Sequence, residues 1–563
     1  MVLGNSIAVV KYLIASIFVG VILGIGGAFA AQGFRSGIII ISNYVENFFA
    51  REPNVFFYLI TLSAALILVH YSKVLIKGKA FQSVSDSIYL AHKANNETDL
   101  KVGFISTLAA FFSASGGASI GQYGPLVHFG TTLGAWLKKT IPFNFTPDLY
   151  IGAGVAASIS SGFGAPLAGL IFAHEAILRH YSHKSILAIA TASGISYAVS
   201  TGIWGDTNII SVSSEQFNLL LILLISFLAG PIFGLIAIIY MRSLLFFAKL
   251  AGSKKLTVFY KYSLGILSLS IIGHFMPEVM GLGSETVSGV LNSSYTLLFL
   301  VVILLGKILA TSISLNFGFF GGVFSPAILV GAAAGAVVST FLVTVGVFED
   351  FQQALVISGM AAVAGAVIGA PICMVIIVLE LTNSYAYALA SLVGVAISVG
   401  YVQVRFGSSY FDVQLLHRGI DISDGRTGLF MTETDILRFA DSNFYTISES
   451  ETVASAVSLM SKIEQSELMV VNESGEFIGK INSLSLFNKK GTLVSAEVID
   501  KDCVYIAHDA SLQSAMEIAS NFVGEIIPII QTDQKKAVAI ITEGAIFQAY
   551  LSKQNQTVEM EKR

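Results

Sequence analysis

Two short turns of this sequence contain the residue types needed to bind an anion through the backbone. Gly121–Pro125 reads GQYGP and Gly321–Pro326 reads GGVFSP, and each turn leads into an apolar stretch. The first N–H groups of a helix lack partners within the helix and lie at the positive end of its dipole. Glycine lets a ligand approach the backbone closely. Because helix N-termini attract anions without a full cation that would trap them, the turns predict an anion site.

Both turns belong to a repeat in the sequence. GQYGPLVHFGTTLG (121–134) aligns with GVFSPAILVGAAAG (322–335) at an offset of 201, and GVAASISSGFGAPLAGLIFAHE (154–175) aligns with GMAAVAGAVIGAPICMVIIVLE (359–380) at an offset of 205. Paired Gly- and Pro-interrupted apolar segments indicate repeated halves whose broken helices meet at an ion site within a membrane. We therefore expect both turns to converge on one anion. The alternative is that these glycines only let helices pack closely.

The composition favours a multi-pass membrane protein. Of the 563 residues, 54% are hydrophobic and 12% are charged, whereas soluble domains carry about 25% charged residues. Apolar runs long enough to cross a bilayer recur up to about residue 404. The net charge of −4 gives no sign of nucleic-acid binding.

No metal site, cofactor or enzymatic activity is predicted. The two cysteines, Cys373 and Cys503, form no disulfide framework, and the nine histidines lack the spacing of zinc ligands. We expect a protein that is not an enzyme and whose substrate is a small ion.

The composition and the hydrophobic pattern of the sequence change after the membrane region. Two similar stretches, 444–487 and 503–551, each read as a short strand, an amphipathic helix, two apolar strands around a polar turn and a last helix. We expect a transmembrane domain over 1–420, with repeat halves at about 55–205 and 215–410. A linker at 421–438, an α/β pair at 439–551 and a disordered tail at 552–563 complete the expected organisation.

These motifs identify a resemblance to the CLC chloride channel/transporter family. GQYGP (121–125), GAPLAGLIFAHE (164–175), GGVFSPAILVGAAAG (321–335) and GAPICMVIIVLELTNSY (369–385) carry it, and the C-terminal stretches resemble tandem CBS domains. The resemblance implies an all-α, multi-pass, inverted-repeat membrane fold with broken helices, followed by an α/β CBS module. It also implies a homodimer with one anion pathway per subunit, placed in a bacterial inner membrane with cytoplasmic CBS domains.

The resemblance places the anion-binding residues. It assigns the main contacts to the backbone N–H groups of Val323 and Phe324 beside Gly322, with the turn of Gly121, Gln122, Tyr123 and Gly124 lining the outer part. In the family an inner serine also contacts the ion, and here the matching position is Gln82, with Ser83 and Ser85 as other nearby donors. The family's tyrosine hydroxyl aligns with Phe411, or with Tyr410 after a slip of one residue.

The expected gate departs from the family pattern. Coupled members carry Glu at the third position of a Gly-Arg-Glu-Gly-Pro turn, whereas this chain has Tyr123 there and Gln122 in place of Arg. A phenol has an ordinary pKa of about 10, against about 4.3 for Glu. Tyr123 can donate a hydrogen bond or block the path, but it cannot replace the anion by its charge. The alternative is that it only fills volume.

The expected proton relay is also missing. The resemblance places a second Glu at position 176, which is Ala176 here. His174 and Glu175 beside it form a possible alternative proton path. Because Glu175 matches Glu380 in the other repeat, a structural role such as capping is favoured for both. Lys307 could add positive potential to the pathway or pair with a carboxylate.

Nucleotide binding by the CBS pair is not favoured, because Ser485 and Ala545 stand where the family carries ribose-binding Asp. The sequence thus favours a passive chloride channel that has lost proton coupling. Open alternatives are an anion/proton antiporter with an atypical path, a transporter of bicarbonate or nitrate, and a regulatory membrane protein that conducts little.

Overall fold

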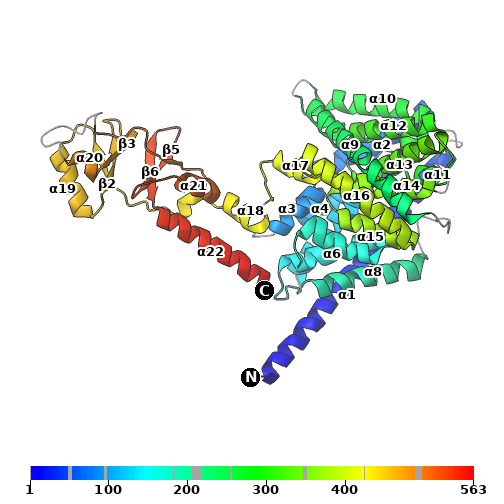
Figure 1. Ribbon diagram of the computed structural model, residues 1–563, viewed down its shortest axis with the longest axis horizontal. Coiled ribbons are helices and arrows are strands. Elements are labelled where there is room, and N and C mark those ends of the chain that lie inside the picture. The colour runs from blue at the N-terminus through cyan, green and yellow to red at the C-terminus, as the bar shows by residue number, and fades with distance from the viewer. Residues whose placement is uncertain are drawn as a thin grey trace. The chain divides into compact units, whose positions relative to one another are not determined.

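The computed structural model describes residues 2–48, 54–93, 98–181, 184–205, 218–253, 256–346, 351–423, 425–487 and 498–562. The chain divides into two compact units, Met1–Ile420 and Asp421–Arg563, and Figure 1 labels many of their elements. The first unit is entirely helical in its described part, whereas the second combines helices and strands.

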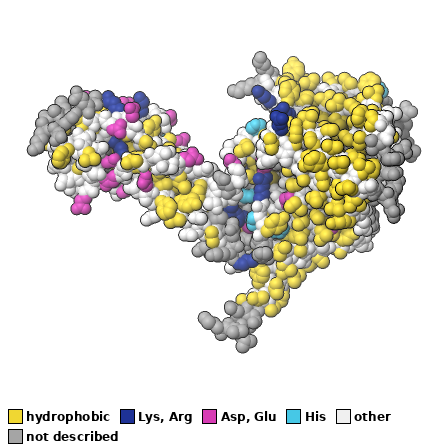
Figure 2. All heavy atoms as spheres, viewed as in Figure 1, with side chains coloured by type: hydrophobic (Ala, Val, Ile, Leu, Met, Phe, Trp, Pro, Cys, Tyr) yellow, Lys and Arg dark blue, Asp and Glu magenta, His cyan; other side chains and the backbone are white. Residues whose placement is uncertain are grey.

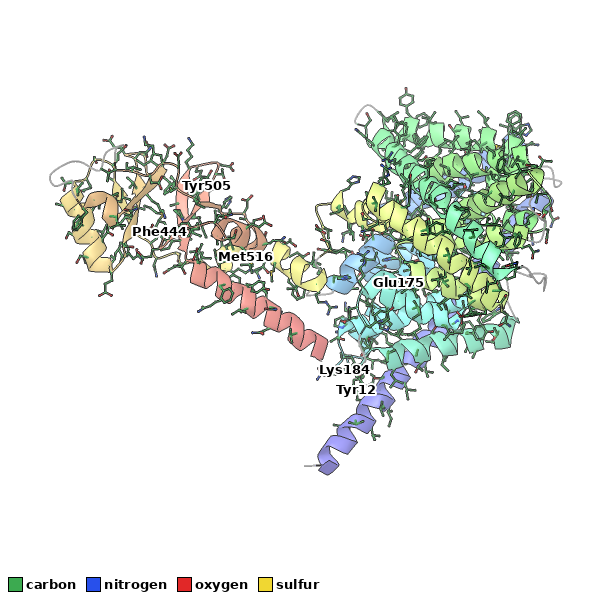
Figure 3. The ribbon with its side chains drawn as sticks, viewed as in Figure 1. Tyr12, Glu175, Lys184, Phe444, Tyr505 and Met516 are labelled. Carbon is green, nitrogen blue, oxygen red and sulfur yellow. The ribbon has the colours of Figure 1, made fainter. Side chains whose placement is uncertain are left out.

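The first half of the N-terminal unit consists of helices of very different lengths. In chain order they are α1 (Val2–Phe48), α2 (Val55–Leu75), α3 (Val84–His92), α4 (Leu100–Ser115), α5 (Tyr123–Thr140), α6 (Pro147–Phe163), α7 (Pro166–Phe172), the π-helix η1 (Ala173–Leu178) and α8 (Ile186–Trp204). The hydroxyl of Tyr12 donates to the carbonyl oxygen of Lys184 at 2.5 Å, which ties α1 to the start of α8 (Figure 3).

The second half repeats this mixture of long and short helices. It contains α9 (Leu219–Ala251), α10 (Val258–Phe275), the 3-10 helix η2 (Pro277–Val279), α11 (Ser284–Leu291), α12 (Leu297–Asn316), α13 (Phe324–Thr344), α14 (Gln352–Ile368), α15 (Pro371–Thr382), α16 (Tyr385–Arg405) and α17 (Tyr410–Leu416). Short helices such as α3, α7, α15 and α17 cannot cross a bilayer alone, as expected for broken helices.

The outer surface of this unit is suited to lipid. Among the described residues, eight helical segments are long and apolar enough to span a membrane. Large apolar side chains point outward, including Leu220 (79% exposed), Leu298 (77%) and Val404 (84%). Figure 2 shows the visible face of this unit mostly covered by hydrophobic side chains. The prediction of a multi-pass membrane protein is therefore confirmed.

The Gly-Ala-Pro motif of each repeat joins two helices. Gly164 ends α6 with φ of +69°, and Gly369 ends α14 with φ of +79°. This left-handed conformation suits glycine. Pro166 and Pro371 then occupy the first turn of the next helix, where the missing N–H costs nothing. The repeated motif thus produces the same helix–turn–helix junction twice.

Other repeated glycines pack helices together. A Cβ at Gly130 would lie 2.3 Å from the carbonyl oxygen of Gly154, and one at Gly331 would lie 2.3 Å from that of Gly359. The α5–α6 and α13–α14 pairs therefore depend on glycine for contact between backbones. The packing alternative holds for these residues.

Each repeat also caps a helix of the other repeat. Both oxygens of Glu175 accept backbone N–H groups at the start of α15, from Ile372 (2.9 Å) and Cys373 (2.7 Å). Both oxygens of Glu380 accept from Leu167 and Ala168 at the start of α7, each at 2.8 Å. Carboxylates at helix N-termini satisfy unpaired donors and oppose the helix dipole. The favoured capping role of the two glutamates is confirmed.

The C-terminal unit contains two similar α/β motifs. The first has β1 (Thr446–Ser448), β2 (Glu467–Val471) and β3 (Phe477–Asn482), and the second has β4 (Ile506–Ala507), β5 (Ile527–Gln531) and β6 (Lys536–Ile541). In each sheet the first strand pairs parallel with the second, which pairs antiparallel with the third. The helices are α18 (Gly425–Glu433), η4 (Ile436–Phe439), α19 (Val453–Ile463), α20 (Ser483–Leu486), α21 (Leu512–Ala519) and α22 (Glu543–Lys562).

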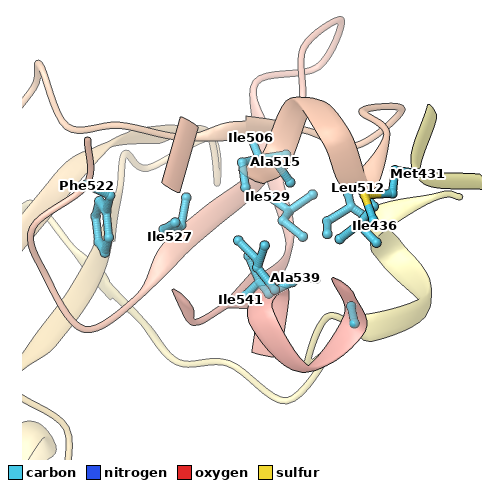
Figure 4. Packing of buried hydrophobic residues seen from close by; sticks show 12 residues of the cluster. Met431, Ile436, Ile506, Leu512, Ala515, Phe522, Ile527, Ile529, Ala539 and Ile541 are labelled. Carbon is cyan, nitrogen blue, oxygen red and sulfur yellow. The ribbon is translucent and has the colours of Figure 1, made fainter. Parts of the chain in front are cut away.

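Each motif has its own apolar core, and a small apolar cluster of Met469, Ile526 and Ile540 joins the two together with polar groups. The core of the second motif includes Ile506, Leu512, Ile527 and Ile541 (Figure 4). Between the motifs, the ammonium group of Lys480 lies 2.8 Å from the Glu467 carboxylate, which also accepts the backbone N–H groups of Glu525 and Ile526, each at 3.0 Å.

Two boundaries differ from the prediction. The interval 421–438, predicted as a linker, contains α18, whose Met431 lies in the core of the second motif together with Ile436. The interval 552–563, predicted to be disordered, is helical through Lys562 as the end of α22, and Arg563 lies outside the described residues. The prediction of disorder relied on the polar composition of this interval, but its Lys, Gln and Glu residues are strong helix formers.

Candidate anion-binding site

The two Gly-Pro turns meet directly. The N–H of Gly121 donates to the carbonyl oxygen of Gly322 at 2.7 Å, and the N–H of Gly322 donates to that of Gly121 at 2.9 Å. This reciprocal pair forms an isolated antiparallel bridge between positions 201 residues apart. The predicted convergence of the two turns is confirmed.

Glycine is required where the turns touch. A Cβ on Gly124 would lie 2.9 Å from the Cα of Gly322, and a Cβ on Gly322 would lie 2.9 Å from the amide nitrogen of Gly124. Both distances are shorter than real Cβ contacts. The turns can bring the starts of α5 and α13 together only because neither residue has a side chain.

The first turns of these helices present unused donors. Among the described residues, no protein acceptor lies within hydrogen-bonding distance of the backbone N–H groups of Val323, Phe324, Tyr123 or Gly124. Buried N–H groups are nearly always paired. Two of these groups belong to Gly124 and Val323, which line one cavity, and they favour a bound anion or water as their partner.

A small cavity lies beside the bridge. Its volume is about 120 Å³, and its walls come from the starts of α3, α5 and α17, from the turn before α13 and from the end of α12. The lining residues are Gln82, Ser83, Val84, Gly124, Pro125, Leu315, Asn316, Phe320, Gly321, Gly322, Val323, Tyr410, Phe411 and Gln414. None of them is acidic or basic, so the cavity offers amide, hydroxyl and backbone donors.

The cavity brings together most of the predicted anion-binding residues. Gln82, Gly124, Gly322, Val323, Tyr410 and Phe411 line it, whereas Gly121, Gln122, Tyr123 and Phe324 do not. Asn316 and Gln414 line it but were missed by the sequence reading. Their contribution depends on packing between distant helices, which no local motif signals.

Tyr123 packs within an aromatic cluster. Its ring stacks on Phe163 at the end of α6, with centroids 3.6 Å apart, and meets the ring of Phe324 edge-on at 5.4 Å. Phe172 of α7 completes the cluster by stacking on Phe324 at 6.1 Å. Tyr123 is 5% exposed. Its ring thus fills volume next to the anion-binding turns, and the gating role remains a prediction.

Gln122 holds the turn of α5 against that of α13. Its backbone N–H donates to the Ser325 hydroxyl at 3.3 Å. Its side-chain oxygen is buried and has no hydrogen-bond partner among the described residues. The residue lies near the site, but its amide does not line the cavity.

Two arginines neutralise carboxylates at the cavity's helices. Asp86 accepts the backbone N–H of Ser83 at 2.7 Å and forms an ion pair with Arg418 at 2.8 Å. Asp412 likewise binds Ser409 at the start of α17 and pairs with Arg179, which follows η1. The first turns of α3 and α17 are therefore fixed by capping carboxylates whose charge is balanced.

The residues of the alternative proton path lie outside the lining of the cavity. Both oxygens of Glu175 are engaged at the start of α15, and Glu175 lies within the helical unit in Figure 3. His174 Nδ1 contacts the carbonyl oxygen of His180 at 3.0 Å, and its buried Nε2 has no partner among the described residues. Ala176, at the position of the missing relay, is buried. None of the three lines the cavity.

Among the described residues, Lys307 forms no ion pair with an acidic side chain, and it does not line the cavity. Its ammonium group donates to the carbonyl oxygens of Val279 and Gly281, each at 3.0 Å. The side chain is fully buried. It fixes the segment between η2 and α11, which packs behind the start of α13 through Gly283 and Leu329.

The described residues contain no cluster of His, Cys, Asp or Glu that could hold a metal ion. In the C-terminal unit the backbone N–H of Ser485 donates to Asn482 Oδ1 at 2.7 Å, and the backbone N–H of Ala545 donates to Thr542 Oγ1 at 3.1 Å. These two positions thus start their helices in the same way and carry no carboxylate for a ribose.

A duplicated helical membrane unit with broken helices around a cavity of this size, followed by a paired α/β module, defines an ion-transporting membrane protein. The chain belongs to the voltage gated chloride channel family, whose model matches residues 64–403. The CBS domain model matches residues 432–488 and 494–552.

Relatives and solved structures agree with this family. The chain is 28% identical over 328 residues to the H(+)/Cl(−) exchange transporter ClcA of Vibrio vulnificus, covering 55% of this chain and 69% of that protein. It is 25% identical over 406 residues to an uncharacterized protein of Methanocaldococcus jannaschii, covering 71% and 95%. The fold is similar to that of a slow cyanobacterial Cl−/H+ antiporter (TM-score 0.64, 22% identity, 72% and 98% covered) and of a eukaryotic CLC transporter (0.62, 16%, 95% and 98%).

Proposed function

We propose that this protein conducts chloride passively through one pathway in each subunit of a homodimer. The observation that carries the proposal is the cavity beside the Gly121–Gly322 bridge, where unused backbone donors and neutral amide and hydroxyl side chains meet. Such a site attracts a small anion by partial charges and holds it less tightly than a full cation would. Fast passage requires that balance.

The side chains available support the proposed loss of proton coupling. Coupled exchange needs a group that alternately binds a proton and competes with the anion. Tyr123 is a phenol stacked on Phe163, Ala176 carries no proton, and the described lining of the cavity includes no carboxylate. These features favour a channel, or an uncoupled transporter, over an exchanger.

Coupled anion/proton exchange is the second candidate, because relatives of this chain are named exchange transporters. Bicarbonate or nitrate could replace chloride as the physiological anion, since backbone and amide donors recognise oxyanions as well. We place the protein in a bacterial inner membrane with its CBS domains in the cytoplasm. There the CBS pair would brace the dimer or regulate passage without binding a nucleotide.

The test is flux from liposomes that contain the purified protein and chloride. The voltage is clamped with valinomycin and potassium, and external chloride and pH are recorded together. Chloride efflux without proton movement supports the proposal, and proton movement in fixed proportion to chloride would establish exchange. If chloride does not leave, nitrate- and bicarbonate-loaded liposomes test the other anions, and failure with all three would contradict anion conduction.

A further inference from the structure

The side chain of Gln414 contacts two other polar residues of the anion-binding region. It lies on α17 and lines the cavity together with Tyr410, one helical turn earlier. Its Nε2 donates to the Tyr410 hydroxyl at 3.0 Å, and its Oε1 accepts from the hydroxyl of Ser85 on α3 at 3.2 Å. Gln414 thus connects the first turn of α17 to the first turn of α3.

The direction of these hydrogen bonds determines what Tyr410 offers the cavity. A tyrosine hydroxyl carries one proton and can also accept a hydrogen bond. Because Gln414 donates to the oxygen of Tyr410, the proton of that hydroxyl is left for another acceptor. Among the described residues the Tyr410 hydroxyl has no such acceptor, although the side chain is only 6% exposed.

The order of donors can be followed back from the cavity. The backbone N–H and the hydroxyl of Ser83 both donate to the Asp86 carboxylate, at 2.7 and 3.0 Å, so the single Ser83 hydroxyl proton is already used. The order of donors therefore starts at Ser85, whose hydroxyl donates to Gln414, and the Gln414 amide donates to Tyr410. In this order the proton of the Tyr410 hydroxyl is available for an anion in the cavity.

We propose that Gln414 is a positioning residue that fixes the Tyr410 hydroxyl as a donor to the transported anion. The inference rests on the proposed anion site and adds to it a determinant of affinity. It also assigns the anion-binding hydroxyl to Tyr410, whereas Phe411 contributes only an apolar wall.

The proposal predicts a specific pattern of chloride affinities, measured by isothermal titration of the purified full-length protein with chloride. Loss of a hydrogen bond to a charged group lowers affinity about tenfold or more, so Tyr410→Phe should have this effect. Gln414→Leu should lower affinity about three- to tenfold, because the hydroxyl is no longer oriented. The double variant should bind no more weakly than Tyr410→Phe, since Gln414 acts through Tyr410.

Controls separate this pattern from general damage. Gln403→Leu changes an exposed glutamine on α16 and should leave affinity unchanged, and Ser85→Ala should weaken binding less than Gln414→Leu. Thermal melting checks that each variant is folded.

Several outcomes would overturn the inference. If Gln414→Leu raises the affinity, Gln414 accepts the Tyr410 proton and the donor order is reversed. If Gln414→Leu has no effect, or if its effect adds to that of Tyr410→Phe, Gln414 does not act through the hydroxyl. If the wild-type protein binds no chloride, the titration is repeated with nitrate and bicarbonate. Failure with all three would contradict the proposed anion site itself, a result distinct from normal wild-type binding with unaffected variants.

Discussion

Replacing a carboxylate by a phenol at position 123 changes what the residue can do near an anion. A carboxylate can occupy the anion's place and leave it on protonation, whereas Tyr123 is a phenol that packs against both Phe163 and Phe324. The ring lies beside the unused donors of α5 and α13 rather than among the residues that line the cavity. At the scale of the residue, the proposed passive conduction therefore assigns Tyr123 a role through the volume of its ring.

Shortening Tyr123 tests this restriction. Tyr123→Ala should raise the rate of chloride efflux from liposomes several-fold if the ring narrows the path, whereas Tyr123→Phe keeps the ring and should remain near the wild-type rate. Loss of a buried aromatic ring costs about 3–5 kcal/mol of stability, so the number of folded molecules must be measured alongside. An unchanged rate per folded Tyr123→Ala molecule would remove Tyr123 from the gate.

Cys503 provides a test outside the membrane. Burial, and then the negative charge of Asp500, raise the pKa of its thiol to about 11. The thiol loses its proton only near that pH, and the thiolate is the reactive form. We expect maleimide labelling of Cys503 in a Cys373→Ser background to be slow at pH 7 and to accelerate continuously up to pH 9. Rapid labelling that is independent of pH would contradict this environment.

At the scale of elements, the functional region depends on where helices begin. The starts of α3, α5 and α17 and the turn before α13 meet at the cavity, and carboxylates cap two of these helices. Asp86 holds the start of α3 and Asp412 the start of α17, and each is neutralised by an arginine from a different segment. Arg418 follows α17 directly and lies two residues before the end of the N-terminal unit. The Arg418–Asp86 pair therefore anchors the chain between the anion site and the CBS unit.

Breaking this anchor should affect passage more than folding. Arg418→Ala leaves the Asp86 charge unbalanced beside an anion-binding turn, so we expect chloride efflux to fall several-fold while thermal stability changes by about 1 kcal/mol or less, as for other exposed ion pairs. Arg418→Lys keeps the charge and should restore most of the rate. Equal rates for the wild type and Arg418→Ala would exclude an electrostatic role.

Removing the reciprocal caps of α7 and α15 should instead affect folding stability more than chloride passage. Glu175→Gln or Glu380→Gln removes a charge that binds two backbone N–H groups, and a lost helix cap costs about 0.5–2 kcal/mol. We expect each substitution to lower the melting temperature while chloride efflux per folded molecule stays unchanged. A selective loss of proton movement in Glu175→Gln would instead support the exchange alternative.

At the scale of the whole molecule, the chain combines two units that each have their own core. In the CBS unit, the buried Lys480–Glu467 pair lies in the first motif, and both residues form hydrogen bonds with the backbone of Ile526 in the second. The Lys480 ammonium also lies 4.8 Å from the centre of the Phe522 ring. Lys480→Met leaves Glu467 without its cation, and removing one partner of a buried pair costs about 3–5 kcal/mol. We expect calorimetry to show a lower melting transition for the CBS unit only, with exposed Lys462→Met as the matched control. A shift of both transitions would contradict independent cores.

Much of this organisation could be predicted because short motifs in the sequence specify it. The Gly-Ala-Pro junctions and the Gly-Pro turns recur at fixed offsets, so their positions, and the meeting of the two turns, follow from the repeat. Gln414 and Asn316 could not be predicted as cavity residues, since Gln414 meets Ser85 across 329 positions. The stacking of Tyr123 on Phe163 has no sequence signal either, because it depends on how α5 packs against α6.

The exchanged glutamate caps have a consequence for expressing the two halves of the membrane unit separately. Glu175 and Glu380 each complete a helix that the opposite half begins, so either half expressed as a separate polypeptide would keep a carboxylate but lose the one its own helix needs. Only the two halves together supply both caps.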